Sequence, residues 1–554
     1  MRPVEALLTV LRQEGVDRVF GNPGTTELPF LDALVDAHDI EYVLGVHEGS
    51  VVAMADGYAR ATGRTAFVSL HVAAGLANGL VGLLNASRSR TPLVVTAGQQ
   101  DRRHLVQDPM LSGDLVGLAG AAVKAAFDVQ HAHDLPVLLR RAFRLARQPP
   151  AGPVFLSLPM DLLAEDTDVD LPARVTLPEP GAATGVDAAV ELLAKATRPA
   201  IVAGDGVGRD GAVGSLVTVA EALGATTYHQ PMSDGLNFPT AHPLHVGTLP
   251  PVNTEIRSLL APHDVVFIAG CHAFMPHHYS PGPAVPRSSR IVQLDDDPAE
   301  VGRNFGVEAA LVGGIRATLD ALADRLRPHP SGRETETAAR ARAVADRTAA
   351  DRARTDAEAV AAYGGAPLDP LAAVHAVASG LPEDAVVVEQ AITAGPLLRT
   401  VLRQTRPRSF VHTLGGGLGS GTGMAVGARL GDPSRPVVAV LGDGSTMFGL
   451  QGLWNAAHDR VPVTYVVLNN GEYRTLKDTL DSWQSNATRA GSYPGLDLVH
   501  PRLDFTRAAA FFGIEAVRVT DAAELAATVA KAAHRDTPLL IDVPVTGHRT
   551  GGRA

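Results

Sequence analysis

The feature that most constrains the fold is a strand–helix–strand pattern in the last third of the chain. An unbroken apolar run, Val437–Leu441, is followed by a glycine-containing turn and by apolar residues at helical spacing over Gly449–His458. A second apolar run, Val463–Leu468, comes next. Because two strands joined by a crossover helix lie parallel, the pattern predicts neighbouring strands of a parallel α/β sheet.

Oxygen-bearing side chains follow both of these strands. Asp443 lies in the turn Gly442–Gly444, and Asn470 comes 27 residues later. The carboxyl ends of parallel strands are where open α/β sheets bind ligands. A carboxylate, an amide and a free backbone carbonyl such as that of Glu472 are hard ligands that suit Mg²⁺ or Ca²⁺, and the glycines let the backbone approach a diphosphate. Each piece alone is most simply a turn or a loop, but together they predict a metal–diphosphate site.

Length and alternation of helices and strands predict the domain organisation. The chain of 554 residues exceeds one ordinary core and predicts about three domains. The fold class is α/β, with three doubly wound parallel-sheet domains. The expected units are 1–165, a middle domain at 186–328, a charged and solvated linker helix within 329–366, and 367–547.

Composition excludes several partners and locations. The net charge is −11 without a basic cluster, which argues against nucleic acid and against an anionic membrane surface. The single cysteine, Cys271, rules out a disulfide framework and a cysteine-based metal site. The chain begins without a signal-peptide pattern and contains no apolar run of about 18 residues. These features predict a cytoplasmic protein with no membrane segment.

The stretch from GDG to NN resembles the cofactor motif of thiamine diphosphate (ThDP) enzymes. The resemblance implies that the cofactor is ThDP, held through Mg²⁺ (or Ca²⁺). It implies metal ligation by Asp443, Asn470 and the backbone carbonyl of Glu472. It also implies that the first domain binds the pyrimidine end of ThDP and the third domain the diphosphate end. In the segment TLGGGLGSG, Leu418 matches the residue over which the family bends the cofactor. The other implied cofactor contacts are Gly416, Gly442, Gly444, Ser445 and Tyr473.

Glu48 stands between a predicted strand and a predicted helix. Taken alone, it is best interpreted as a helix N-terminal carboxylate that complements the helix dipole. The resemblance implies another role, as the acid partner of the cofactor's aminopyrimidine ring. The neighbouring residues predict an apolar wall around the carboxyl group, made of Val46, Val51, Val52 and Met54.

The resemblance extends over the whole chain and is strongest to benzoylformate decarboxylase among ThDP enzymes. It rests on the segments GNPGTTELPFL, LHVAAGLANG, TPLVVTAGQQ and HHYSPG. It implies non-oxidative decarboxylation of a 2-oxo acid to an aldehyde, the reaction of a carbon–carbon lyase. Thr25 matches the residue that binds the substrate carboxylate. His71 and His277 match an acid/base pair, although either histidine alone would more often be structural.

The expected substrate pocket departs from that enzyme. His412, Thr475 and Thr479 stand where benzoylformate decarboxylase has aromatic or small residues. This difference favours a smaller or more polar 2-oxo acid than benzoylformate. The remaining expected pocket residues are Met110, Leu111 and Leu476.

Two other functions remain open from the sequence. One is a carboligase of the acetohydroxyacid synthase or benzaldehyde lyase kind. The other is a non-catalytic ThDP-fold paralogue, which the presence of Glu48 and the metal ligands argues against. The resemblance further implies a homodimer or a dimer of dimers (a homotetramer), with each cofactor between the first domain of one subunit and the third domain of another.

Overall fold

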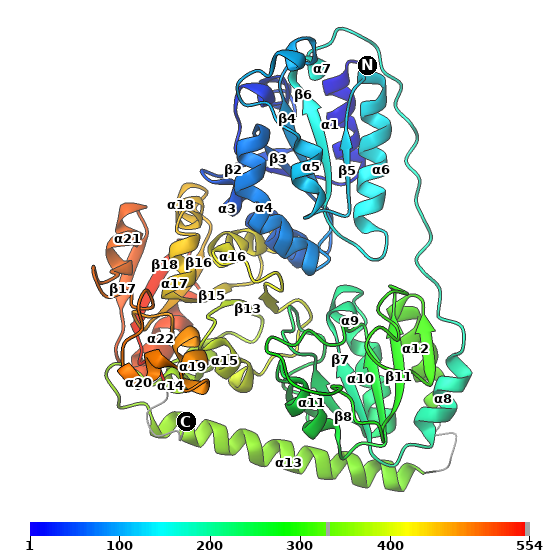
Figure 1. The fold of residues 1–554 in the computed structure, drawn as a ribbon, viewed down its shortest axis with the longest axis vertical. Helices are drawn as coiled ribbons and strands as arrows, with labels where there is room; N and C mark the ends of the chain where they lie inside the picture. Colours follow the sequence, from blue (N-terminus) through cyan, green and yellow to red (C-terminus); the bar gives the residue numbers. More distant parts are fainter. Residues whose placement is uncertain (328–332, 549–554) are drawn as a thin grey trace.

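The computed structural model describes residues 1–327 and 333–548 and consists of three six-stranded parallel sheets, each flanked by helices (Figure 1). We call the units with strands β1–β6, β7–β12 and β13–β18 the first, middle and third domains. The predicted α/β fold of three doubly wound parallel sheets is confirmed. Residue 328 and the first residues of the predicted linker, 329–332, lie outside the described residues.

The first and third sheets have the same strand order. The first runs β2-β1-β3-β4-β6-β5 and the third β14-β13-β15-β16-β18-β17, which is the same permutation. The middle sheet runs β12-β11-β10-β7-β8-β9, a different order. The two end domains therefore have the same topology, as a duplication would produce.

The first domain builds its sheet from strands that are buried on both faces at the centre, which is why β3, β4 and β6 are nearly continuous apolar runs. The strands are β1 (Arg18–Gly21), β2 (Glu41–Leu44), β3 (Ala66–Leu70), β4 (Leu93–Gln99), β5 (Ala125–Asp128) and β6 (Val154–Pro159). The helices are α1 (Pro3–Gln13), α2 (Leu28–Leu34), α3 (Glu48–Thr62), α4 (Val72–Arg88), α5 (Leu115–Gly120), α6 (Leu135–Arg147) and α7 (Met160–Leu163).

The middle domain has a hydrophobic core of its own. Its strands are β7 (Pro199–Ala203), β8 (Thr226–His229), β9 (His245–Thr248), β10 (Val265–Ala269), β11 (Arg290–Asp295) and β12 (Ala309–Val312). Its helices are α8 (Val186–Ala194), α9 (Asp205–Arg209), α10 (Val213–Leu223), α11 (Asn253–Leu260) and α12 (Ile315–Leu326).

The third domain carries the strand–helix–strand unit that the sequence predicts. Its strands are β13 (Val386–Gln390), β14 (Phe410–His412), β15 (Val437–Gly442), β16 (Val463–Asn469), β17 (Glu515–Arg518) and β18 (Leu539–Pro544). Its helices are α14 (Pro370–Gly380), α15 (Gly395–Val401), α16 (Ser420–Gly431), α17 (Asp443–Phe448), α18 (Gly452–His458), α19 (Arg474–Ser482), α20 (Asn486–Ala490), α21 (Phe505–Phe511) and α22 (Ala522–Ala532).

The crossover between β15 and β16 differs from the prediction of one helix over 449–458. It consists of two short helices, and the first, α17, already begins at Asp443. The break falls at Gly449, whose backbone packs so closely on Gly419 that any side chain there would overlap the Gly419 carbonyl oxygen. A contact with a distant loop therefore divides the helix, and no local periodicity signals it.

The charged linker forms the long helix α13 (Glu334–Ala361), which spans from the middle to the third domain in Figure 1. The expectation of a solvated helix holds for only part of its surface. Val344 lies in the core of the middle domain, and Arg352 donates to the backbone carbonyl of Thr240 at 2.8 Å. The helix is therefore docked along one side. Within the described residues, no helix is both long enough and apolar enough to cross a membrane.

The first and third domains share one hydrophobic core, which α3 and α16 join. These helices meet at backbone contact, because glycines stand at the crossing points. A Cβ on Gly57 would overlap the Met424 carbonyl oxygen, and a Cβ on Gly427 would overlap that of Met54. The pair of domains is thus a single packed body.

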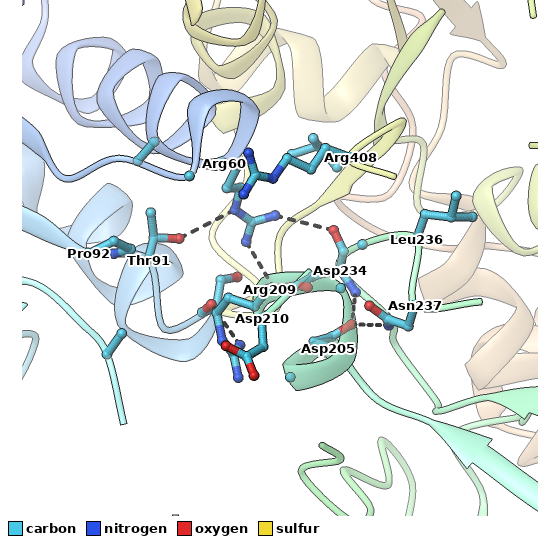
Figure 2. Close-up of a pocket in the computed structure, with 18 of the residues that line it drawn as sticks. Arg60, Thr91, Pro92, Asp205, Arg209, Asp210, Asp234, Leu236, Asn237 and Arg408 are labelled. Atoms are coloured by element: carbon cyan, nitrogen blue, oxygen red, sulfur yellow. Dashed lines mark hydrogen bonds and ion pairs between the residues drawn. The ribbon is translucent and has the colours of Figure 1, made fainter. Parts of the chain in front are cut away.

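A polar junction joins all three domains (Figure 2). Arg60 pairs with Asp56 at 3.0 Å and with Asp234 of the middle domain at 3.1 Å, and donates to the His412 carbonyl of the third domain at 2.7 Å. A cavity of about 440 Å³ adjoins this cluster, and its described lining includes none of the predicted site residues. Burial and the nearby Asp234 carboxylate raise the pKa of Asp205 in the cavity wall to about 8.

Candidate functional site

The predicted metal ligands come together at the carboxyl edge of the third sheet. β15 and β16 are paired, with Gly442 opposite Leu468, so Asp443 and Asn470 leave neighbouring strands. The Asp443 carboxylate accepts from the backbone N–H of Gly444 at 2.7 Å and of Gly471 at 2.6 Å. Burial raises the pKa of Asp443, although these backbone amides oppose the shift.

The donor set at this edge fits a hard divalent cation. Each Asp443 oxygen has a further lone pair beyond its one backbone hydrogen bond. The Asn470 side-chain oxygen accepts from the Glu472 N–H at 2.9 Å, and the Glu472 carboxylate is paired with Lys477 at 2.5 Å, so Glu472 offers its carbonyl. Among the described residues, no group of three or more His, Cys, Asp or Glu side chains could hold a metal. A cation here would need further oxygen ligands, such as phosphate and water.

Hydrogen bonds with Gln390 hold the glycine-rich loop that precedes α16. Gln390, at the end of β13, accepts from the N–H of Gly419 at 3.1 Å and of Gly421 at 3.0 Å. Its carbonyl accepts from the Ser445 hydroxyl at 2.6 Å, so one residue links this loop to the GDG turn. Gly416 is exposed, has a φ of +73°, and would meet nothing within 4 Å if it had a Cβ. Gln390 was not predicted; its only sequence signal is a polar residue ending a valine-rich strand.

Glu48 opens α3 and is 6% exposed. Val51, Val52 and Met54 are buried as expected, but the prediction was wrong for Val46, which is 47% exposed. The carboxylate also has polar neighbours. It accepts from the side-chain amides of Asn22 and Asn78, both at 3.0 Å. Asn22 belongs to the GNPG segment and Asn78 to α4, so both stand in segments already noted in the sequence.

His71, which precedes α4, is held by a buried carboxylate that the sequence analysis missed. Its Nδ1 lies 2.9 Å from Glu27, and Glu27 is only 4% exposed. Glu27 also accepts from the N–H of Gly24 at 2.8 Å, from the N–H of Gly98 at 3.0 Å and from the Thr26 hydroxyl at 2.7 Å. These three donors and the His71 ring hold the Glu27 carboxylate in place. The carboxylate in turn fixes the orientation of the ring. The Nε2 atom of His71 has no hydrogen bond among the described residues. Thr25, the next residue toward the N-terminus from Thr26, is exposed.

For the decarboxylation that the sequence resemblance implies, we expect Glu27→Gln to lower kcat by about 10- to 100-fold with a smaller change in KM, because an amide facing Nδ1 favours the wrong ring tautomer. Steady-state kinetics with a 2-oxo acid substrate measure this. Thr26→Val is the comparison: it removes one donor to Glu27 and a 3.1 Å contact with His71 Nδ1 but keeps the Glu27–His71 pair, so a smaller loss of kcat is expected. Equal kinetics for both variants and the parent would contradict a role for Glu27.

His277 lies in the loop after β10, and the structure does not bring it into contact with His71 within one chain. Its Nδ1 is 3.0 Å from Nε2 of His278, and its side chain is exposed. Glu48 and His71 likewise have hydrogen-bond partners only in the first domain, within the part of the chain that the structure describes. Among the described residues, Glu48 and His71 therefore share no hydrogen bond with His277 or with the residues of the third domain.

The predicted pocket residues have different surroundings. Met110 is 83% exposed and Leu476 51% exposed. The Thr475 hydroxyl pairs with that of Thr393 at 3.0 Å, and the Thr479 hydroxyl donates to the Thr475 carbonyl at 2.9 Å. Both threonine hydroxyls are therefore engaged by the protein. Leu111 is 40% exposed beside Met110.

His412 has a protein partner rather than a free ring. Its Nδ1 lies 3.0 Å from the Glu389 carboxylate, which also pairs with Arg399 at 3.1 Å. Burial alone would raise the pKa of Glu389, but His412 and Arg399 lower it to about 2. The His412 ring is buried, and its Nε2 has no hydrogen-bond partner.

Comparison with known proteins agrees with this geometry. Family models of the thiamine pyrophosphate (ThDP) enzymes match residues 1–118 as the N-terminal TPP binding domain, 186–322 as the central domain and 394–543 as the C-terminal TPP binding domain. These ranges carry β1–β4, most of the middle domain, and Asp443 with Asn470. The chain belongs to the thiamine pyrophosphate enzyme family.

Within that family, the chain resembles both decarboxylases and synthases. It is 36% identical to benzoylformate decarboxylase of Pseudomonas aeruginosa over 97% of each chain. It is 28% identical to the acetolactate synthase isozyme 2 large subunit of Escherichia coli, over 98% of this chain and 96% of that one. The solved structure of a thiamine diphosphate-dependent 4-hydroxybenzoylformate decarboxylase from Rhodococcus jostii RHA1 superimposes with a TM-score of 0.86, at 31% identity and 99% coverage of both chains. The resemblance predicted from the sequence is confirmed.

Proposed function

We propose that the protein is a ThDP- and Mg²⁺-dependent decarboxylase that converts a 2-oxo acid to an aldehyde, a carbon–carbon lyase. The observation that carries this proposal is the Glu27–His71 pair. A ring fixed through Nδ1 presents Nε2 as a proton donor and acceptor, as protonation after loss of CO₂ requires. The decarboxylases among its relatives support the same reaction.

The third domain would hold the cofactor and its metal. Asp443, Asn470 and the Glu472 carbonyl ligate Mg²⁺ on the diphosphate. Leu418 and the carbonyl of Gly416 would hold the aminopyrimidine end of the cofactor. When bound, ThDP supplies an electron sink for the bond that loses CO₂. The other proposed contacts are Gly442, Gly444, Ser445 and Tyr473.

The first domain would handle protons and the substrate carboxylate. Glu48 holds a proton against the ring nitrogen of the cofactor, with Asn22 and Asn78 fixing its carboxyl group. The exposed Thr25 hydroxyl donates to the substrate carboxylate. His71 Nε2 transfers a proton to the substrate oxygen, and His277 supplies a proton to the product carbon.

The two sets of groups would meet across a subunit interface. Because the hydrogen-bond partners of Glu48 and His71 among the described residues all lie in the first domain, we propose that the two side chains act on a cofactor held by the third domain of a partner subunit. The working unit is then a homodimer or a dimer of dimers of a cytoplasmic protein.

We propose a substrate smaller or more polar than benzoylformate. The buried His412 and the threonines of α19 replace aromatic walls, and Met110, Leu111 and Leu476 keep an apolar side. We expect an aliphatic or polar 2-oxo acid to show a kcat/KM at least about tenfold above that of benzoylformate, since one or two misfit contacts cost this much. A screen of 2-oxo acids with purified protein, ThDP and Mg²⁺ measures it, with EDTA-treated protein as the control. Fastest turnover of benzoylformate would overturn the substrate proposal.

Carboligation is the second candidate, and the acetolactate synthase relative is the observation that favours it. Product analysis after incubation with one 2-oxo acid separates the two reactions. Aldehyde as the main product supports decarboxylation, and an acyloin supports carboligation.

A further inference from the structure

Helix α4 presents two asparagines on one face, and they hold different parts of the molecule. Asn78 and Asn85 are seven positions apart, which is about two helical turns. Asn78 donates to the Glu48 carboxylate of its own domain at 3.0 Å. Asn85 instead reaches into the third domain.

Asn85 binds the glycine-rich loop through both backbone polar groups of one residue, Gly417. Its Oδ1 accepts from the Gly417 N–H at 3.1 Å, and its Nδ2 donates to the Gly417 carbonyl at 2.9 Å and to the Ser420 hydroxyl at 2.8 Å. The side chain is 1% exposed, so these three bonds form away from water. A buried amide with three partners fixes both position and orientation of the segment that it binds.

The loop packs closely against α4 because its glycines have no side chains. A Cβ on Gly415 would overlap the Asn85 side chain, and a Cβ on Gly417 would overlap Val81. Gly416, between them, faces open space. Gly415 and Gly417 therefore pack directly against α4, and Gly416 faces away from the helix.

We propose that Asn85 is a positioning residue for cofactor binding: helix α4 of the first domain sets the conformation of the Gly415–Leu418 loop in the third domain of the same chain. This inference rests on the proposed function, in which Gly416 and Leu418 contact ThDP. Asn78 of α4 binds Glu48, which handles a proton at one cofactor site. Asn85 of the same helix binds the loop that holds the cofactor of the other site. The dissociation constant of ThDP rises in proportion as the competent loop conformation becomes less populated.

The test compares Asn85→Ala with Asn455→Ala in the full-length protein. Asn455 is a matched control because it is fully buried in α18, joins the same two domains by donating to the Leu44 carbonyl at 2.6 Å, and does not contact the loop. Calorimetric titration with ThDP in the presence of Mg²⁺ gives the dissociation constant of each. We expect about a tenfold weaker constant for Asn85→Ala, from two or three lost neutral hydrogen bonds, and less than a twofold change for Asn455→Ala. Hydrogen exchange of the apoprotein should show faster exchange of the Gly417 N–H in Asn85→Ala only.

The other outcomes distinguish failure of this inference from failure of the proposed function. Unchanged ThDP binding by Asn85→Ala overturns the inference while leaving the proposed function intact. Failure of the parent protein to bind ThDP overturns the proposed function and the inference with it. If Asn85→Ala does not fold, Ser420→Ala replaces it, since it removes one acceptor of the Asn85 amide. A ThDP constant about threefold weaker supports the inference, and an unchanged constant overturns it.

Discussion

Replacing Glu48 with Gln is expected to lower kcat for decarboxylation of a 2-oxo acid by about a thousandfold, while the affinity for ThDP and Mg²⁺ changes less than about threefold. The amide has the shape of the carboxyl group but cannot exchange a proton with the ring nitrogen of the cofactor. A flip of the Asn78 amide lets it pair with the new NH₂ group, so the fold of α3 is retained. Rapid-quench or steady-state kinetics give kcat, and calorimetry gives the affinity.

Glu48→Asp is the matched control for this prediction. It keeps the acid and withdraws it by one methylene, so an intermediate loss is expected. If Glu48→Gln retained more than a tenth of the parent kcat, the role of Glu48 would have to be given up. Loss of ThDP binding in that variant would instead point to a structural role.

The second large effect concerns stability, at the crossing of α3 and α16. We expect Gly427→Ala to lower the free energy of unfolding by about 3 kcal/mol or more, because the added methyl group would overlap the Met54 carbonyl oxygen. Neither backbone can move without separating the shared core of the first and third domains. Urea denaturation followed by circular dichroism measures the change.

Gly214→Ala provides the comparison. Gly214 lies in α10, and a Cβ there would meet nothing within 4 Å. Alanine at this position is expected to be neutral or to stabilise by up to about 1 kcal/mol, as in an ordinary helix. Identical urea midpoints for Gly427→Ala and the parent would show that α3 and α16 tolerate separation.

Much of the fold could be predicted because it depends on local patterns. Apolar strands such as Val437–Leu441, separated by helical periodicity, define parallel sheets without any knowledge of distant contacts. The position of Asp443 beside Asn470 follows from the same pattern, since both residues end neighbouring strands. The spacing of these two residues predicts a metal–diphosphate site, and the resemblance implies the cofactor family.

The missing parts all depend on contacts between distant segments. Glu27 lies 44 positions from His71, Gln390 acts on a loop 27 to 31 positions away, and Asn85 reaches across 332 positions. Each is an ordinary polar residue at the end of a strand or on a helix, and no pattern within its own segment identifies a partner. The break between α17 and α18 has the same cause, because the Gly449–Gly419 contact joins two loops.

The shared core has a consequence for the exchange of domains between relatives. The chain contains three sheets of equal strand number, and one large core cluster spans the first and third domains. The two clusters of the middle domain take in no residue of either sheet, and Leu236 is the middle-domain residue that packs into the core of the third domain. A chimera that replaced the first domain alone would have to reproduce the glycine contacts of a foreign α16, so the first and third domains are expected to be inherited and recombined together. The middle domain, joined to them by Arg60, Arg90 and the helix α13, is the one module that could be exchanged by itself.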